Sequence, residues 1–316
     1  MTESVDVTVI IVTRDTCALT GTAVRSVLAD GPASASEVIV VDNGSNDGTS
    51  EVLARDFPSI KVIRSETNLG FARAGNQAAR QARGEFLLLL NSDARLQPGT
   101  LKSAVAWMRA HPDCAVAGAQ LLNADGSRQN SIANFPTLAT ELLNKSLLRR
   151  LFPGRFPGKE QSFAGPVVVE TVVGAFMLVR RDVWEKLGGL DERFFFFFEE
   201  TDFCLRACRA GFRILHLPEV KVWHGQGQSA KQVSGAARIE YWRSRYRYFA
   251  KNYSSLTLAF LAAGLWIRLL FDWIAALALR SVTFGRSERW RSRSEVCTAL
   301  VGWHLRGCPA GAGLPR

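Results

Sequence analysis

Three carboxylates stand within four positions of the sequence, at Glu199, Glu200 and Asp202, directly after a run of five phenylalanines. A helix that begins there would favour acidic residues in its first turn, so capping alone accounts for them. Crowding of the carboxylates beside the apolar run would also raise the pKa of one of them, which suits a general base. Both interpretations stay open on this pattern.

Asp93 and His224 are candidates for an ion site. Asp93 follows four leucines in the tetrapeptide Asn-Ser-Asp-Ala. A carboxylate there suits a hard divalent cation, which takes oxygen ligands and leaves positions open for substrate phosphates. Capping of the next helix is an equal alternative. His224 precedes a Gly-Gln-Gly segment that allows a ligand close to the backbone, so it is either a metal or phosphate contact or a structural histidine.

Asp42 and Asn43 end another apolar run. An acidic residue at that point of a doubly wound fold can hydrogen-bond a nucleoside, although Asp-Asn-Gly alone is better interpreted as a turn. The glycine fingerprint of dinucleotide-binding folds is missing after the first apolar run, where Thr13, Arg14 and Asp15 stand. This counts against a nicotinamide-dependent dehydrogenase.

An alternation of apolar runs and helix-period segments must position these residues. Apolar runs without alternation predict buried parallel strands, and the short links between the segments indicate an α/β, doubly wound sheet flanked by helices. Ligands bind such sheets at the carboxyl ends of the strands. The predicted strands are 7–13, 38–43, 61–64 and 86–91, and the predicted helices are 19–28, 47–57, 71–83 and 98–111.

The middle of the chain is less regular. Residues 123–165 contain Gly, Pro and basic residues and are predicted to form a long, partly mobile loop region. Residues 167–179 are predicted as a strand interrupted at a Gly-Ala pair, 199–210 as a helix, and 213–223 as mixed strand and turn. Residues 239–253 are predicted to form a helix rich in aromatic residues and arginine.

The basic charge is confined to the end of the chain. The net charge is +10, and residues 231–316 hold 14 Lys and Arg against four Asp and Glu, so residues 1–230 are balanced. This shift predicts a boundary between a balanced domain over 1–230 and a basic helical segment over 231–316 that associates with an anionic membrane surface.

Within that segment, residues 256–279 form an apolar stretch of about the length of a bilayer span. Arg268 and Asp272 interrupt it, four positions apart, so they can pair on one helix face. Two central charges argue against a simple lipid-facing span, and an interfacial amphipathic helix or a helix hairpin fits at least as well. Six cysteines without a C-x-x-C pair indicate neither zinc nor a disulfide framework. With no signal-peptide pattern, we expect the cytoplasmic face of the cell membrane.

Taken together, the segments resemble glycosyltransferase family 2, in particular its rhamnosyltransferase-like branch. The likeness runs in order across residues 7–230, through VIIVT, EVIVVDNGSNDGT, NLGFA, GEFLLLLNSDA, GAFMLVRR, GGLDERFFFFFEETDFCLR and His224. The resemblance implies a GT-A fold, an inverting mechanism, and a nucleotide-sugar donor held with Mg²⁺ or Mn²⁺. It favours dTDP-L-rhamnose as donor, with a UDP-sugar as the alternative. The implied acceptor is a hydroxyl of a glycan, polyprenyl-diphosphate-linked, in cell-envelope polysaccharide synthesis.

The resemblance also carries roles to single residues. Asp93 and His224 would hold the metal and diphosphate, and Glu200 or its neighbour Glu199 would be the base. Asp202 is expected in the same catalytic group and, with Asp191, would shape the acceptor pocket. Asn91 replaces the first Asp of the metal motif, Glu-Glu replaces the usual Glu-Asp, and Arg14-Asp15 replaces a common Tyr-Asn. The expected donor-binding residues are Thr13, Arg14, Asp42, Asn43, Asn68, Gly70, Phe71, Asn76 and Asn91.

Three other classes fit less well. A nucleotidyltransferase of sugar phosphates uses a similar sheet but shows a glycine-rich, basic loop after the first strand, which is missing here. A non-catalytic membrane scaffold would not need Asp93, Glu200 and His224. The Arg-rich tail carries no base-reading motif, so we expect no nucleic-acid partner.

Overall fold

The computed structural model describes residues 5–30, 36–156, 161–225 and 234–316. The chain divides into two compact units. The first contains the chain up to Phe135, Leu148–Phe195, and the stretch that begins at Glu199 and ends at residue 229. The second contains Pro136–Leu147, Phe196–Phe198 and the remaining C-terminal chain. Two short segments from inside the first 230 residues therefore belong to the C-terminal unit.

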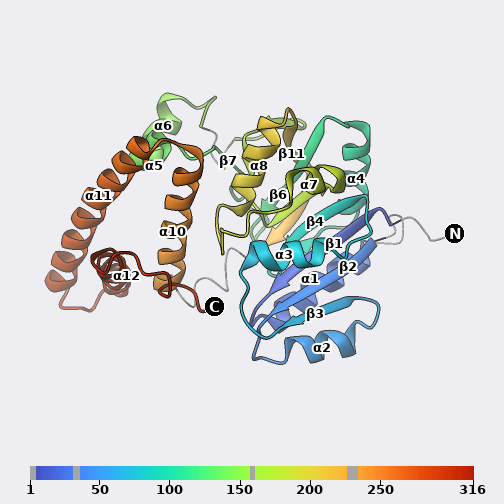
Figure 1. The fold of residues 1–316 in the computed structure, drawn as a ribbon, viewed down its shortest axis with the longest axis horizontal. Coiled ribbons are helices and arrows are strands. Elements are labelled where there is room, and N and C mark those ends of the chain that lie inside the picture. Colours follow the sequence, from blue (N-terminus) through green and yellow to red (C-terminus); the bar gives the residue numbers. More distant parts are fainter. Residues whose placement is uncertain (1–4, 31–35, 157–160, 226–233) are drawn as a thin grey trace. The chain divides into compact units, whose positions relative to one another are not determined.

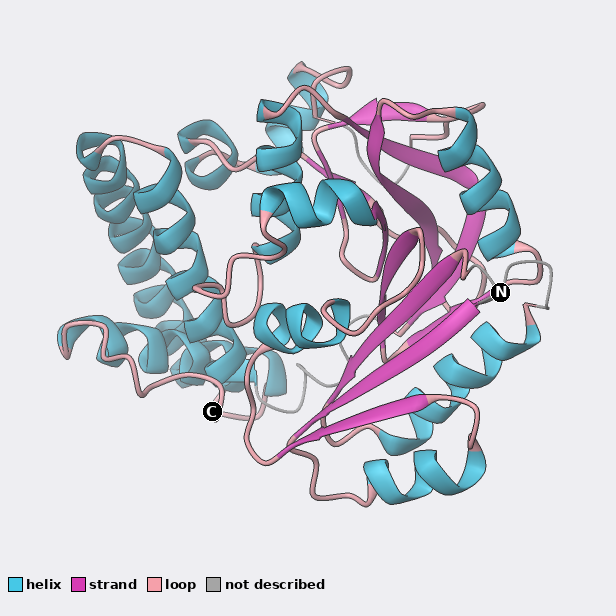
Figure 2. Ribbon diagram, turned by 45° about the vertical axis from the view of Figure 1, so that its right-hand side comes forward, coloured by secondary structure: helices cyan, strands magenta, loops and turns pink. Residues whose placement is uncertain are grey.

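Within the described residues, the first unit has a sheet of nine strands (Figure 2). The strands are β1 (Val7–Thr13), β2 (Ser36–Asn43), β3 (Lys61–Ser65), β4 (Phe86–Asn91), β5 (Ala94–Leu96), β6 (Cys114–Leu122), β8 (Val167–Val169), β10 (Phe176–Arg180) and β11 (Arg213–His224). Their order is β3-β2-β1-β4-β10-β6-β11-β5, with β8 paired to β11. The first four strands are parallel, β10 is antiparallel to both neighbours, and β6 and β11 are parallel. The predicted mostly parallel α/β sheet is confirmed.

Helices cover both faces of the sheet, which explains why the strands are apolar without alternation. On one face lie α1 (Cys17–Ala29), α2 (Thr49–Asp56) and α4 (Thr100–Ala110). On the other lies α3 (Phe71–Ala79), which packs against β1 and β2 and places Gly75 beside Leu89 (Figure 1). The side chains between this first set of helices and the sheet form one hydrophobic core. The helices contribute Val24, Val27, Leu53, Leu101 and Val105, and the strands contribute Val9, Ile11, Val40, Leu88 and Leu90.

Strand β6 was not predicted from the sequence, because its run of Ala and Gly contains only one β-branched residue, Val116, of the kind typical of strands. All of its residues are buried. Their small size is required where a two-stranded ribbon of β7 (Ile132–Ala133) and β9 (Thr171–Val172) lies close by. A Cβ atom on Gly118 would lie 2.4 Å from Cγ1 of Val172. Close packing therefore outweighs strand propensity in this part of the sheet.

The predicted loop over 123–165 is partly wrong, because it contains β7 and two short helices, α5 (Leu138–Leu142) and α6 (Lys145–Leu151). The hydroxyl of Thr137 accepts a hydrogen bond from the backbone N–H of Thr140, which caps α5. Residues 157–160 of this stretch lie outside the described residues.

The predicted strand over 167–179 is likewise three strands, β8, β9 and β10, with breaks at Glu170 and at Val173–Ala175. After β10 come α7 (Arg181–Leu187) and α8 (Glu199–Arg209), and α8 matches the predicted helix to within one residue. These elements complete the first unit.

The second unit is helical, with α10 (Ser234–Asn252), α11 (Ser255–Val282) and α12 (Glu288–Leu305). The segment with α5 belongs to it because Glu141 pairs with Arg245 at 3.1 Å and the hydroxyl of Tyr253 donates to the carbonyl of Pro136. Helix α12 was not predicted from the sequence.

Helix α11 is long and apolar enough to cross a membrane by length and composition. Leu261, Leu265 and Leu269 form a buried stripe along it, whereas its other faces remain apolar and exposed. The predicted pairing of Arg268 with Asp272 is wrong: Asp272 accepts from Arg293 of α12 at 2.9 Å. The charge near the middle of α11 is therefore balanced by a neighbouring helix.

Candidate active site

The register of the parallel strands brings the predicted residues to one edge of the sheet. Thr13 lies opposite Asp42, and Val12 lies opposite Asn91, so β1, β2 and β4 end together. The Thr13 hydroxyl is hydrogen-bonded to the hydroxyls of Thr16 at 2.8 Å and Thr20 at 2.6 Å. Strand topology thus places a polar edge where parallel sheets bind ligands.

The loops after β1 and β2 are joined by hydrogen bonds from backbone to side chain. The N–H of Asp15 donates to the hydroxyl of Ser45, and the N–H of Asn46 donates to the Asp15 carboxylate at 2.8 Å. Asp15 has a φ of +51°, which a short polar side chain tolerates. Arg14 is held beside Asp15 at 3.6 Å with 30% of its side chain exposed. The two loops therefore form one rigid rim, and Arg14 lies on it.

Asp42 and Asn43 are buried and hold the neighbouring turns. The Asp42 carboxylate accepts from the backbone N–H of Ser45 and from the hydroxyl of Ser50. The Asn43 amide donates to the side-chain oxygen of Asn68 at 2.8 Å and accepts from the N–H of Leu69 at 2.8 Å. Both residues fix the shape of the rim, which is the turn chemistry that the tripeptide alone predicted.

The segment from Asn68 to Asn76 is attached to the region before the three carboxylates. The N–H of Phe71 donates to the carbonyl of Phe195 at 2.7 Å, and a Cβ on Gly70 would lie 2.5 Å from that carbonyl oxygen. Gly70 has a φ of +81°, so both its conformation and the close approach require glycine. The Asn76 amide is bonded to both the carbonyl and the N–H of Leu190. These residues clamp the chain that leads to Glu200.

Asp93, His224 and Asn91 lie side by side at the ends of β4 and β11. His224 Nε2 is 3.4 Å from Asp93 Oδ1 and 3.4 Å from Asn91 Nδ2. The Asp93 and His224 side chains are 6% and 10% exposed. The N–H of Gly225 donates to the carbonyl of Asp93, which fixes the end of β11 beside the turn after β4. The structure therefore brings together the two residues expected to hold a metal.

The donor set fits Mg²⁺ or Mn²⁺. Such ions are held by one or two protein side chains and complete their shell with water and substrate phosphates. Adjacent ligands of an octahedral ion with bonds of roughly 2.0–2.1 Å are about 3.0 Å apart, close to the spacing of Asp93 and His224. Among the described residues, no cluster of three or more His, Cys, Asp and Glu could hold a metal.

The structure separates the three carboxylates at the start of α8. The Asp202 side chain is fully buried and accepts from Arg206 Nε at 2.8 Å, and Arg206 also donates to the carbonyls of Leu187 and Gly189. Glu199 is buried, whereas Glu200 is partly exposed. Surrounding protein nevertheless desolvates the Glu200 carboxyl and raises its pKa above the usual 4.5. Glu200 is thus partly exposed and has a raised pKa, whereas the side chains of Glu199 and Asp202 are buried.

The turn before β10 connects Glu200 to the end of β4. The Cβ and Cγ of Glu200 are each 3.6 Å from the position that a Cβ on Gly174 would take. The next residue, Ala175, accepts a hydrogen bond from the N–H of Asn91 at 3.1 Å. Glu200 therefore packs against the residue that precedes the partner of Asn91, and Gly174 leaves room for its side chain.

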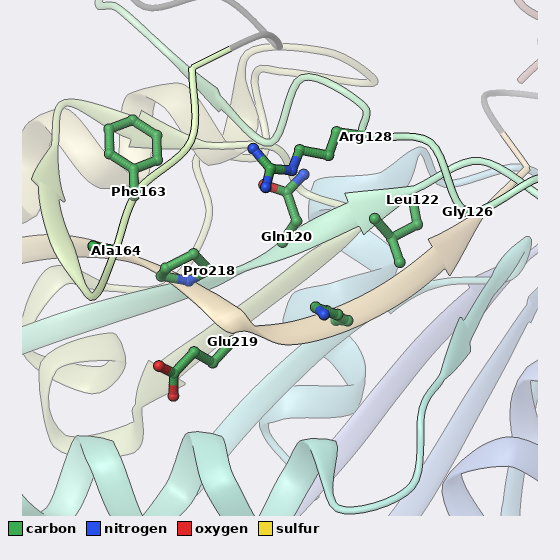
Figure 3. A pocket seen from close by; sticks show the side chains of 9 residues that line it. Gln120, Leu122, Gly126, Arg128, Phe163, Ala164, Pro218 and Glu219 are labelled. Atoms are coloured by element: carbon green, nitrogen blue, oxygen red, sulfur yellow. The ribbon is translucent and has the colours of Figure 1, made fainter.

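A hollow of about 400 Å³ lies elsewhere along β6 and β11 (Figure 3). It is lined by polar and charged side chains together with Phe163 and Pro218, and none of the predicted site residues is among them. Its remaining lining residues are Gln120, Leu122, Gly126, Arg128, Ala164, Glu219 and Lys221.

Sequence reasoning missed one residue of the site. Gln129 follows the hairpin after β6, is 4% exposed, and places its side-chain oxygen 3.0 Å from His224 Nδ1. The signal that could have located it is the Asp-Gly pair at 125–126, a typical hairpin turn, where Gly126 has a φ of +80°.

A mostly parallel sheet flanked by helices, with polar loops at the carboxyl ends of its parallel strands, is an architecture of the GT-A type. The chain belongs to glycosyltransferase family 2: the sequence model of that family, Glycosyl transferase family 2, matches residues 8–188, more than half of the chain. The protein is therefore a glycosyltransferase.

Two relatives of known activity indicate the branch of the family that this chain resembles. N-acetylglucosaminyl-diphospho-decaprenol L-rhamnosyltransferase of Mycobacterium tuberculosis is 26% identical over 285 residues, covering 84% of this chain and 89% of that protein. The dTDP-rhamnosyl transferase RfbF of Shigella flexneri is 24% identical over 204 residues, covering 63% of this chain and 62% of that protein. Both relatives support the rhamnosyltransferase-like branch.

Solved structures share the fold. Mannosyltransferase PcManGT from Pyrobaculum calidifontis, in complex with GDP-Man and Mn²⁺, superimposes with a TM-score of 0.54 at 19% identity. The match covers 96% of this chain and 87% of that chain. At this identity the likeness supports the architecture.

Proposed function

We propose that the protein transfers L-rhamnose from dTDP-L-rhamnose, with inversion, to a hydroxyl of a lipid-diphosphate-linked glycan in cell-envelope polysaccharide synthesis. The observation that carries the proposal is geometric: Asp93 and His224 lie side by side at the strand ends, and Glu200 packs on Gly174, next to the residue bonded to Asn91. The named activities of the relatives supply the sugar and the class of acceptor.

The proposed mechanism follows from where charge develops. Glu200 takes the proton of the acceptor hydroxyl while that oxygen attacks the anomeric carbon from the face opposite the nucleoside diphosphate. The bond from the anomeric carbon to the diphosphate oxygen breaks as the new glycosidic bond forms, so no covalent enzyme intermediate is needed. A raised pKa suits Glu200 because a base is most effective when its pKa is near the working pH.

The leaving diphosphate gains negative charge, and Asp93 and His224 would hold a divalent cation beside it. The cation, when bound, offsets that charge as a Lewis acid. Thr13, Arg14 and the turns held by Asp42 and Asn43 form the rim that receives the nucleoside. In this proposal Asn76, Gly70 and Asp202 position the loop and helix that carry Glu200, and Glu199 supports the same helix start.

The test uses the full chain and a panel of nucleotide sugars with a synthetic lipid-diphosphate glycan. We expect transfer from dTDP-L-rhamnose; transfer from a UDP-sugar instead would replace the donor but keep the reaction class. Glu200→Gln should lose about 10²- to 10⁴-fold in kcat, the usual contribution of a general base, and keep nucleotide binding. Glu219→Gln, an exposed glutamate of the same unit, is the matched control. Near-normal turnover of Glu200→Gln would contradict the assignment.

The Asp93→Ala variant tests whether Asp93 binds a divalent cation together with the nucleotide. We expect the variant to lose the dependence of dTDP affinity on Mg²⁺ or Mn²⁺, measured by calorimetry with each ion and with chelator. Unchanged metal-dependent affinity would remove Asp93 from the site.

We further infer that the helical unit holds the enzyme on an anionic membrane surface, at the cytoplasmic face. Phe260, Ile267, Phe271 and Ile274 of α11 are each 57–71% exposed, a contiguous apolar surface that rarely stays uncovered in water. Arginines at positions 280, 286, 289, 291 and 293 follow at the C-terminal end of α11 and the start of α12. An apolar face beside a cationic cluster complements the interface of anionic lipid.

Liposome flotation of the full chain measures separately how the apolar face of α11 and the arginine cluster contribute to membrane binding. Phe271→Ser should weaken binding to all vesicles, whereas Arg289→Ser with Arg291→Ser should weaken binding only to anionic vesicles at low salt. The control is Phe163→Ser, which alters a hydrophobic side chain of the first unit. Binding that is equal for wild type and Phe271→Ser would contradict the membrane role of α11.

A further inference from the structure

Gln129 contacts His224 twice. Its side-chain oxygen lies 3.0 Å from His224 Nδ1, and its Nε2 donates to the His224 carbonyl at 2.7 Å. The same nitrogen is within 3.2 Å of the carbonyl of Leu122 and 2.9 Å of the side-chain oxygen of Asn123. Gln129 is buried, so these contacts are shielded from water. A buried carboxamide therefore connects the hairpin after β6 to the end of β11.

The hydrogen-bond partners of the Gln129 carboxamide determine the positions of its oxygen and its NH₂ group. The carbonyl oxygens of His224 and Leu122 can only accept hydrogen bonds, so the group that faces them must be the NH₂ of Gln129. The Gln129 oxygen then faces His224 Nδ1, and because an amide oxygen only accepts, Nδ1 must carry a hydrogen. In a neutral imidazole the proton on Nδ1 leaves a lone pair on Nε2.

That lone pair lies at the proposed metal position. Nε2 is 3.4 Å from Asp93 Oδ1 and 3.4 Å from Asn91 Nδ2, whose N–H can donate to the lone pair only while no cation occupies it. A nitrogen lone pair and a carboxylate oxygen that face one another repel, and a cation that both ligate removes the repulsion. A histidine that binds metal through one ring nitrogen almost always donates the other N–H to a fixed acceptor.

We propose that Gln129 is a positioning residue that holds the His224 ring in its Nδ1–H tautomer and presents Nε2 to a divalent cation shared with Asp93. Gln129 touches neither sugar nor phosphate and acts through His224. The proposal deepens the proposed function and rests on its metal site.

The first readout is the tautomer itself. The chain has four histidines, so ¹⁵N labelling of histidine gives few ring signals, and His224→Gln assigns the relevant pair. In the wild type we expect one protonated nitrogen, Nδ1, and one unprotonated nitrogen, Nε2. In Gln129→Leu, which has no acceptor, we expect the Nε2–H form to appear. Gln129→Glu restores the acceptor opposite Nδ1 but not the donor to the His224 carbonyl, and should return the hydrogen to Nδ1.

The second readout is Mn²⁺ affinity in the presence of dTDP, measured by electron paramagnetic resonance without turnover. Loss of such a supporting contact costs about 10- to 100-fold in metal affinity, and we expect this loss for Gln129→Leu. The matched control is Asn123→Ala, which removes hairpin bonds to Ser127 and to Gln129 but leaves both contacts with His224. It should keep both the tautomer and the affinity for Mn²⁺.

Three results would overturn the proposal: a wild-type ring protonated at Nε2 or at both nitrogens, a Gln129→Leu ring with the wild-type pattern, or an equal loss of Mn²⁺ affinity in Asn123→Ala. If the wild type binds no Mn²⁺ with dTDP, the proposed metal site fails and the role of Gln129 toward a cation fails with it. Failure of rhamnosyl transfer alone would change the proposed function and leave these readouts intact.

Discussion

Replacing Asp202 by Ala separates structural from catalytic carboxylates at the start of α8. The Asp202 side chain is 0% exposed and its partner Arg206 is 20% exposed. Breaking a buried ion pair costs about 3–5 kcal/mol. Because Arg206 is partly solvated and keeps its bonds to the carbonyls of Leu187 and Gly189, we expect the lower end, about 3 kcal/mol. For a unit of roughly 200 residues this lowers Tm by about 6–12 °C.

The assay is thermal unfolding followed by circular dichroism, with kcat measured at a temperature where each variant remains folded. Glu51→Ala is the control, because its pair with Arg64 is 62% and 61% exposed and such surface pairs are worth about 0–1 kcal/mol. We expect Asp202→Ala to be unstable but nearly normal in kcat. An Asp202→Ala variant with the Tm of the wild type would show that the ion pair adds no stability and would refute the reasoning. If that variant also lost kcat about 100-fold, the carboxylate would act on the substrate.

Three further outcomes are expected. The raised pKa of Glu200 places the acid limb of the kcat profile above pH 4.5, because the base must lose its proton as pH rises, and Glu200→Gln should lack that limb. Gly70→Ala puts a methyl group 2.5 Å from the carbonyl oxygen of Phe195 at a φ of +81°, so calorimetry should show a loss of about 2 kcal/mol or more. Thr137→Ala removes the cap of α5 and should cost about 1 kcal/mol in urea unfolding.

The part of the fold that follows from hydrophobic pattern was predictable. The bounds of β1 and β4 agree with the predicted strands, because apolar runs that end in polar residues leave little choice of register. The elements that were missed depend on tertiary packing. β6 is rich in alanine and has Gly118 where Val172 lies close by, and α12 is rich in arginine and shows no clear apolar period.

The site was predictable to the extent that strand ends define it. Thr13, Asp42 and Asn91 come together because three parallel strands end in register. Which of these residues are free for a ligand was not predictable, since Asp42 is occupied by Ser45 and Ser50 across the turn. Gln129 was missed because a single polar residue after a hairpin has no sequence period, and its role depends on a contact 95 positions away.

The phenylalanine run has a consequence for how the enzyme can be tuned. Phe197 and Phe198 have φ values of +69° and +72°, which cost about 1–2 kcal/mol each in residues other than glycine. Both are held by ring contacts with Tyr241 inside the helical unit, and Glu200 follows two residues later in the catalytic unit. The backbone directly before Glu200 is therefore strained, and ring contacts with Tyr241 hold it in that conformation. A substitution at Tyr241 would remove these ring contacts, so it should weaken the hold on the backbone directly before Glu200.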